Sequence, residues 1–392
     1  MKNTKSKFLF SARILFCFTT VLFTLPLGAD SGKQRIAADV TLLKSLGIKP
    51  YTMDSAGQVG LAYVSDYQLQ VIPHQAHQFR KCGGFTFVED QTSFLKNLNH
   101  PQLSQMIGIT KVEHRADVQK IVDQVDEARL REWVQWLSSF PHRMYNRPEP
   151  NRHVEQLYLK LINLSANMAV PFEVEYVEHK RISQKSLKVT IKGTKYPDEI
   201  VVLGGHLDST NWSGNAPGAD DNASGSSNLL ETLHLLSENG FRPDRTIEFF
   251  WYAGEEGGLL GSSEIAKSYK QANKNVKAVL QLDMTLFPGE GEGVIGNISD
   301  YTDPQLRKIL EEINHTYVGA KFVDDRCGYA CSDHASWFNQ GYPAVVPFEA
   351  TTNTMNPDIH TSKDVLTPKM NFKHSALFSK LAIAFAMTLG KD

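Results

Sequence analysis

Apolar and polar residues follow two kinds of pattern along the C-terminal two thirds of this chain, one typical of helices and one typical of strands. From residue 117 to 140, apolar residues recur at every third or fourth position, which predicts amphipathic helix. Further on, short apolar runs alternate with longer segments of helical period. The expected strands are 186–193, 199–206, 246–253 and 276–284, and the expected helices are 224–240 and 258–270.

This order predicts an α/β protein with three layers, αβα, around a central mixed, mostly parallel sheet. The positions of four polar side chains matter more than the strand count, because His206, Glu255, Glu256 and Asp283 lie at or just beyond the C-terminal ends of three expected strands. Ligands of open α/β sheets bind outside those ends. We therefore expect these side chains to meet at one edge of the sheet.

Length and composition indicate one large catalytic domain with a smaller unit, since the chain has 392 residues, of which 41% are hydrophobic. The 41 basic and 43 acidic residues are interspersed and leave a net charge of -2. Such a balance gives no overall positive potential that would attract nucleic acid or an anionic membrane, so neither is an expected partner.

The N-terminus has the pattern of a secretory signal peptide. Lysines and Arg13 precede an uncharged stretch from Ile14 to Leu25, and small residues up to Ala29 follow. About 12 apolar residues are too few to span a bilayer, which needs about 20. We expect residues 1–29 to be cleaved and the mature protein to be soluble and exported, to the periplasm or beyond the cell. Residues 30–115 carry none of the clustered motifs and form a separate segment before a catalytic domain at 116–392.

Two cysteines lie four residues apart, Cys327 and Cys331. In an oxidising compartment such a pair can close a small loop, whereas in a cytosol it indicates free thiols or half of a metal site. A metal site of that kind needs a second pair, and after removal of the signal peptide only Cys82 remains. A disulfide is therefore favoured.

Two imidazoles and four carboxylates occur in short motifs, and this set suits two adjacent zinc ions and a general base. Asp221 precedes an expected helix, where it can bridge two ions or merely cap the helix. Of the neighbours Glu255 and Glu256, one can bind metal while the other accepts a proton from water. Asp208 can orient the His206 ring or cap a turn. The contiguous Ser332, Asp333 and His334 cannot form a catalytic triad, because consecutive side chains diverge.

Taken together, the motifs GGHLDST, PGADDNASG, YAGEEGGLLGS, LQLDMT, CGYACSDHASW and NPDIHTS occur in this order, and with them the chain strongly resembles the secreted bacterial leucyl aminopeptidases. These are cocatalytic di-zinc exopeptidases with the zinc-dependent exopeptidase fold. The resemblance covers roughly residue 125 to the C-terminus. It implies hydrolysis of the N-terminal residue from peptides with a free N-terminus. We expect the protein to be a monomer.

The resemblance also implies roles for individual residues. One zinc would be bound by His206 and Asp283, a second by Glu256 and His360, with Asp221 bridging and Glu255 as general base and acid. Asp208 would support His206, and Ser332 would support Asp283. The implied disulfide joins Cys327 to Cys331, the bond after Asp221 is expected to be cis, and residues 30–115 are expected to be a propeptide that assists folding and masks the site until cleaved. The positions of the side-chain pocket are Met284, Tyr329, Phe348 and Ile359, which suit Leu or Phe.

Other functions remain open on the sequence alone. A glutaminyl cyclase of this scaffold holds a single zinc and lacks the counterpart of His206. A carboxypeptidase or dipeptidase would need a basic residue to hold the substrate carboxylate. A non-enzymatic binding ectodomain would be expected to have lost ligands or the base. Glu290 and Glu292, in a loop after the Asp283 strand, would favour an N-terminal Lys or Arg if that loop covered the pocket.

Overall fold

A six-stranded sheet forms the centre of the C-terminal part of the chain, in the order β12-β9-β7-β8-β6-β5. Strands β12, β9, β7 and β8 run parallel, and β6 and β5 are antiparallel to their neighbours. The mixed, mostly parallel sheet that the sequence predicts is thereby confirmed. Its strands are β5 (Glu173–Val177), β6 (Ser186–Ile191), β7 (Tyr196–His206), β8 (Arg245–Tyr252), β9 (Asn275–Gln281) and β12 (Ala344–Val345).

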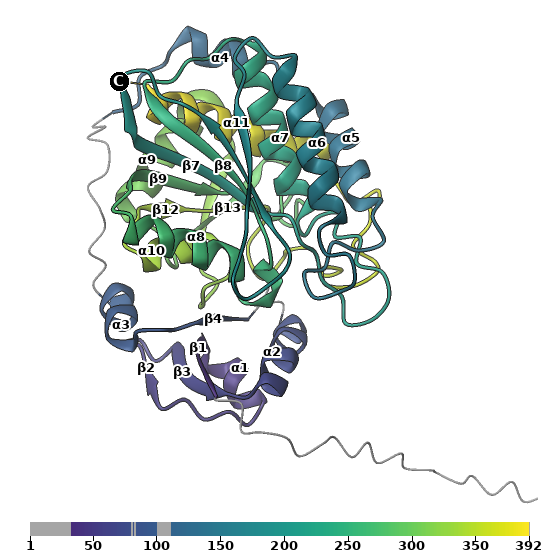
Figure 1. Cartoon of the computed structure of the whole chain (residues 1–392), viewed down its shortest axis with the longest axis vertical. Coiled ribbons are helices and arrows are strands. Elements are labelled where there is room, and N and C mark those ends of the chain that lie inside the picture. Colours follow the sequence, from purple (N-terminus) through teal and green to yellow (C-terminus); the bar gives the residue numbers. More distant parts are fainter. Residues whose placement is uncertain (1–32, 80, 82–83, 100–110, 392) are drawn as a thin grey trace, which may run out of the picture. The chain divides into compact units, whose positions relative to one another are not determined.

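Helices cover both faces of this sheet in the computed structural model, which describes residues 33–79, 81, 84–99 and 111–391 (Figure 1). Alternate residues of a strand point to opposite faces. Val201 and Leu203 of β7 accordingly belong to one apolar core, and Val202 belongs to the other. The first core includes α4 (Ala116–Val122), α5 (Glu127–Ser138), α6 (Arg152–Ala166), α7 (Ala223–Glu238), α9 (Pro304–Tyr317) and α11 (Phe372–Gly390), and the second includes α8 (Leu260–Gln271) and α10 (His334–Asn339).

The helical pattern expected over 117–140 forms two helices, α4 and α5, where the sequence suggested one. Asp126 separates them, because its side chain accepts a hydrogen bond from the backbone N–H of Ala128 at 2.8 Å and so begins α5. The apolar period continues across the break, since Val118, Leu130 and Val134 all enter the same core. The helical period of apolar residues therefore predicted the buried faces of α4 and α5 correctly. It did not reveal the N-cap at Asp126 that separates the two helices.

A smaller sheet lies outside the main one and carries part of the site. It consists of β10 (Val294–Ile298), β11 (Lys321–Asp325) and β13 (Pro347–Phe348), in the order β11-β10-β13. β10 pairs in parallel with β11 and antiparallel with β13. Phe348, one of the expected pocket residues, ends β13.

Residues 33–99 form a second sheet with its own helices. The antiparallel strands β1 (Gln34–Asp39), β2 (Thr52–Met53), β3 (Val59–Val64) and β4 (Phe85–Phe87) have the order β2-β3-β1-β4. The helices are α1 (Val40–Ser45), α2 (Asp66–Gln78) and α3 (Gln91–Asn99). A separate apolar cluster that includes Ile36, Leu42 and Ile72 fills this unit. Ala37, Leu61 and Phe94 of these residues also belong to the second apolar core of the main sheet, and the boundary at 115 stays a prediction.

The predicted signal peptide and Cys82 lie outside the described residues. Within the part of the chain that the structure describes, no helix combines the length and the apolar character needed to cross a bilayer.

Candidate metal centre

The candidate metal ligands stand at the ends of β7, β8 and β9 and in two loops nearby, in an arrangement that the sequence pattern predicted. His206 is the last residue of β7, and Asp283 follows β9 by two positions. Asp221 directly precedes Asn222, the N-cap of α7. Because β7 and β9 are parallel neighbours, their carboxyl ends bring His206 and Asp283 together.

The turn before α7 is anchored to the neighbouring strand. The peptide bond between Asp221 and Asn222 is cis, as the resemblance implied. The Asn222 amide accepts a hydrogen bond from Gly225 N–H at 2.9 Å and donates one to the carbonyl of Leu282 at 3.0 Å. The start of α7 and the end of β9 are thus joined through one side chain.

Six ligand atoms fall into two groups that share Asp221. In the first group, His206 Nε2 lies 3.1 Å from Asp221 Oδ1 and 3.2 Å from Asp283 Oδ1. In the second, His360 Nε2 lies 2.9 Å from Asp221 Oδ2 and 3.1 Å from Glu256 Oε2. Each group has ligand atoms close enough to hold one metal ion, and all five residues are buried. Asp221 offers one carboxylate oxygen to each group, which is the arrangement a bridging ligand requires.

Glu255 belongs to neither group, although it precedes Glu256. Both begin a short 3₁₀-helix, η1 (Glu255–Gly257), after β8, so their side chains diverge. The residue pattern left open which of the two binds metal, and the family resemblance implied Glu256. The structure places Glu256 in a ligand group and leaves Glu255 buried beside it, with an Oε2 atom that accepts no hydrogen bond from the described residues.

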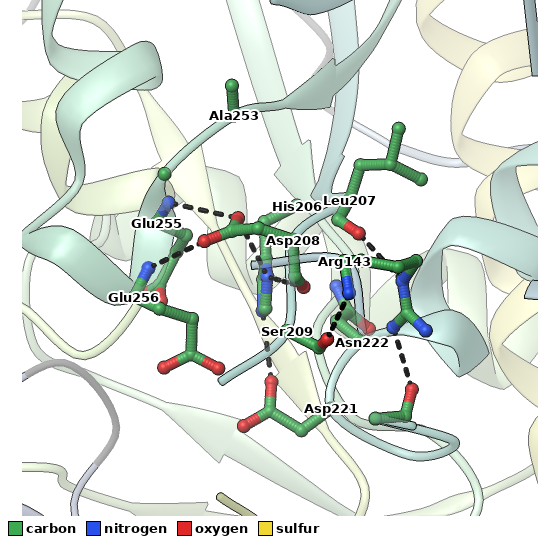
Figure 2. A network of polar contacts seen from close by, with 12 residues as sticks. Arg143, His206, Leu207, Asp208, Ser209, Asp221, Asn222, Ala253, Glu255 and Glu256 are labelled. Atoms are coloured by element: carbon green, nitrogen blue, oxygen red, sulfur yellow. Dashed lines mark hydrogen bonds and ion pairs between the residues drawn. The ribbon is translucent and has the colours of Figure 1, made fainter. Parts of the chain in front are cut away.

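Asp208 connects the His206 strand to this 3₁₀-helix (Figure 2). Its carboxylate accepts hydrogen bonds from the backbone N–H groups of Glu255 at 3.1 Å and Glu256 at 3.3 Å. The His206 Nδ1 atom lies 3.1 Å from the Asp208 carbonyl oxygen and 3.5 Å from its carboxylate. Asp208 therefore contacts the ring as the sequence suggested, and it additionally positions both glutamates.

Ser332 and Asp333 lie on the other side of the first group. The Ser332 hydroxyl donates to Asp283 Oδ2 at 2.5 Å, in the place that the resemblance implied. Asp333, which follows it, accepts a hydrogen bond from Gln281 at 3.0 Å, and burial raises its pKa to about 7. The role of Asp333 was not foreseen, because its only sequence signal is its position next to Ser332.

Burial and like charge shape the electrostatics of the centre. Burial raises the pKa of Glu255 well above its ordinary value and that of Glu256 to about 7. Although burial opposes it, the histidines His206 and His360 lower the pKa of Asp221. Crowded, desolvated carboxylates of this kind are costly unless cations accompany them. The centre is thus suited to bind positive charge.

Asp364 and Arg143 form hydrogen bonds with the backbone next to the metal centre, and neither was identified from the sequence. The carboxylate of Asp364 accepts the backbone N–H groups of Asp220 and Asp221, each at 3.0 Å. The fully buried guanidinium of Arg143 donates to the carbonyls of Leu207 and Gly218, both at 2.8 Å. Asp364 could have been suspected from its place four residues after His360, whereas nothing in the sequence marks Arg143.

A cavity of about 350 Å³ adjoins Asp283. Tyr329 and Phe348, two of the expected pocket residues, line it. The other two, Met284 and Ile359, are not among its lining residues; they are 0% and 1% exposed and pack with Met355 and Phe348. Residues 327 and 331 form a disulfide, and both line the same cavity. Two of the four expected pocket residues thus line this cavity, in a wall that also contains the charged residues Lys81, Asp325 and Arg326.

The acidic loop after Asp283 does not line this cavity. Glu290 accepts hydrogen bonds from the hydroxyls of Thr351 and Thr354. Glu292 forms an ion pair with Lys373 at 2.7 Å. Both carboxylates thus have partners outside the lining of this cavity.

Comparisons with known proteins agree with this geometry. Residues 187–384 match the sequence pattern that defines Peptidase family M28. The chain is 38% identical to a probable leucine aminopeptidase of Trichophyton verrucosum over 77% of its own length and 86% of the relative's. It is 32% identical to a probable aminopeptidase of Saccharomyces cerevisiae, over 78% and 85%. The crystal structure of the LapA aminopeptidase of Legionella pneumophila superposes with a TM-score of 0.78 at 26% identity, over 92% of this chain and 99% of that one.

Proposed function

Because this chain belongs to peptidase family M28, we propose that it is an exported aminopeptidase that uses two zinc ions and Glu255 to remove a large N-terminal residue, such as Leu or Phe, from peptides. The observation that carries the proposal is the pair of ligand groups that share Asp221. One zinc would be held by His206, Asp283 and Asp221, and the other by Glu256, His360 and Asp221.

The ligand atoms are suited to zinc both in their chemical type and in their buried surroundings. Imidazole nitrogen and carboxylate oxygen are ordinary zinc ligands. Both carboxylate oxygens of Glu256 are buried and accept no hydrogen bond from the described residues. A buried carboxylate without donors is costly, so a metal ion is the partner that explains its position. Asp208 and Ser332 then support the ligands by hydrogen bonds, as residues around metal sites do.

Glu255 is the general base in this proposal. When bound, the zinc ions polarise the scissile carbonyl, lower the pKa of nearby water and favour the ionised form of neighbouring carboxylates. Glu255 lies beside both ligand groups without belonging to either, and Asp208 fixes its backbone. It would take a proton from the attacking water and return it to the leaving amine. Its burial keeps bulk water from competing for that proton.

The substrate's first side chain would occupy the cavity next to Asp283. Phe348, Met355 and Ile298 supply apolar lining, and about 350 Å³ accommodates a Leu or Phe side chain. Burying such a side chain contributes about 1.5–3 kcal/mol, which favours large apolar residues over small ones.

The N-terminal segment would be a propeptide that covers the site until it is cleaved, after the signal peptide over 1–29 has directed export. Phe79 and Lys81 of this segment line the cavity that contains Asp283. The Lys81 ammonium donates to the Cys327 carbonyl at 3.1 Å and lies 4.7 Å from the centre of the Tyr329 ring. These contacts support a masking role, since they cover the place proposed for the first side chain.

One experiment tests the proposal against its rivals. The full chain and its processed form are assayed for hydrolysis of a leucyl anilide and for bound metal. An aminopeptidase of this kind hydrolyses the anilide with two zinc ions per chain, and faster after processing. A glutaminyl cyclase would bind one zinc and cyclise an N-terminal Gln, and a binding domain would turn over neither substrate. Full metal occupancy in the processed form without anilide hydrolysis would overturn the proposal.

A further inference from the structure

A second, larger cavity of about 860 Å³ reaches the other ligand group. Glu256 and His360 lie in its wall, whereas the smaller cavity contains Asp283. Each cavity thus meets a different ligand group of the metal centre. A peptide bound with its first side chain in the smaller cavity must place its remaining residues elsewhere, and the larger cavity offers that space.

The wall of the larger cavity carries positive charge. Arg147 and Arg181 line it, and Glu256 is the only acidic residue among the described residues that do so. Because Glu256 is a proposed zinc ligand, its charge would be compensated in the loaded enzyme. Asn146 and Asn211 add amide groups to the same wall. The side chains away from the metal centre therefore favour a negatively charged ligand.

The two arginines differ in the contacts that they make with other side chains. Arg147 is exposed and forms no ion pair with any carboxylate in the described part of the chain. Arg181 lies over the Phe87 ring at 4.5 Å, with its Nη2 atom 3.8 Å from Glu89 Oε1. Phe87 and Glu89 belong to the N-terminal segment. In the full chain Arg147 is accordingly the more available of the two cations.

We infer that Arg147, with Arg181, binds a carboxylate in the part of the substrate that follows the scissile bond, so that the enzyme prefers short peptides with a free C-terminal carboxylate or peptides with an acidic residue near the N-terminus. This inference rests on the proposed function and specifies its substrate class. A guanidinium matches the planar carboxylate with paired donors, which an amide cannot replace.

Binding to a catalytically inert chain tests the inference directly. The zinc-loaded, processed chain with Glu255→Gln is titrated by calorimetry with Leu-Gly-Gly and with Leu-Gly-Gly-amide, which differ only in the terminal charge. A second pair, Leu-Glu-Gly-amide and Leu-Gln-Gly-amide, distinguishes a side-chain carboxylate from the terminal one. Arg147→Ala and Arg181→Ala are added singly and together. Arg152→Ala, an exposed arginine at the start of α6 that does not line the cavity, is the matched control.

The expected result is a preference of about tenfold for at least one charged ligand over its neutral partner, the size of one charge-assisted hydrogen bond. Arg147→Ala should reduce this ratio to near one, and Arg152→Ala should leave it unchanged. Equal affinities for charged and neutral ligands, or a ratio that survives replacement of both arginines, would overturn the inference. So would a failure of all four peptides to bind.

Failure of the inference and failure of the proposed function can be told apart. A leucyl anilide has no carboxylate, so its hydrolysis by the wild-type chain reports on the metal centre alone. Anilide hydrolysis without any carboxylate preference refutes only the role of the arginines. Absence of anilide hydrolysis in the processed, zinc-loaded enzyme refutes the proposed function itself.

Discussion

Asp364 holds the backbone of Asp221, because its Oδ2 atom accepts the Asp221 N–H at 3.0 Å while its Oδ1 atom accepts the preceding N–H. Both groups are buried, so the loss of this carboxylate would leave two N–H groups without an acceptor. Since Asp221 contributes to both ligand groups, a displacement of its backbone affects two metal ions at once.

Asp364→Ala is therefore expected to weaken binding of both zinc ions by about 10- to 100-fold, the usual effect of losing a group that supports metal ligands. Competition with a chelator measures both affinities, and circular dichroism verifies that the variant is folded. Lys363→Ala, at the exposed neighbouring position, is the control. Unchanged affinity in a folded Asp364→Ala protein would show that the Asp221 turn needs no such support.

Glu255→Gln is expected to lower kcat by at least about 100-fold, the lower range for loss of a general base. Because Glu255 lies outside both ligand groups, the variant should still bind two zinc ions. Steady-state kinetics with a leucyl anilide and metal analysis are measured on the same preparation. Near-normal turnover with full zinc would remove Glu255 from its assigned role.

Asp221→Ala and Asp283→Ala should differ in the number of zinc ions they lose. Asp221 provides one oxygen to each group, so its removal should reduce the zinc content of both sites. Asp283 belongs to one group, so its removal should chiefly affect one equivalent. Metal analysis after dialysis against a weak chelator distinguishes the two patterns. A loss of one equivalent in each variant would argue against bridging by Asp221.

The stability of the metal-free protein should depend on pH through Glu256. Burial raises the pKa of this carboxyl to about 7 from 4.5, so between these values the folded chain retains a proton that the unfolded chain has released. The contribution of Glu256 to stability is therefore present below pH 4.5 and is lost as the pH rises toward 7. In the presence of EDTA, the Tm of the wild type should fall over this range relative to Glu256→Gln. Parallel Tm profiles would contradict the shift.

The disulfide should support the side-chain pocket more than the metal centre. Cys327 and Cys331 close the loop that carries Tyr329, and all three line the cavity beside Asp283. Replacing Cys331 with Ser should raise KM for a leucyl anilide more than it lowers kcat, with zinc content unchanged. Alkylation of the mature protein without reductant should label neither cysteine. Cys82 should be absent from the mature protein, whose N-terminus is expected beyond it.

The sequence by itself determined β6, β7, β8 and β9, the helices α7 and α8, and the residues at the ends of these elements. Apolar periods predicted the buried faces of β7, β8 and β9, and the motifs at the ends of these strands supplied His206, Glu256 and Asp283. Such patterns are local, because alternation and helical period follow from burial of one face. Local signals could also mark Asp221 and His360 as candidates, but they could not show that these residues share a site.

The family resemblance already implied roles for Glu255, Glu256 and Asp208, and only the tertiary structure shows which contacts hold these residues and the Asp221 turn in place. Glu255 and Glu256 have the same chemistry and differ only in their direction from η1, and the backbone N–H group of each donates a hydrogen bond to the Asp208 carboxylate. Arg143 and Asp364 act on the Asp221 turn across more than 70 residues of sequence each. The basic wall formed by Arg147 and Arg181 likewise joins separate loops. No short-range pattern encodes such contacts, since they arise only when distant segments pack together.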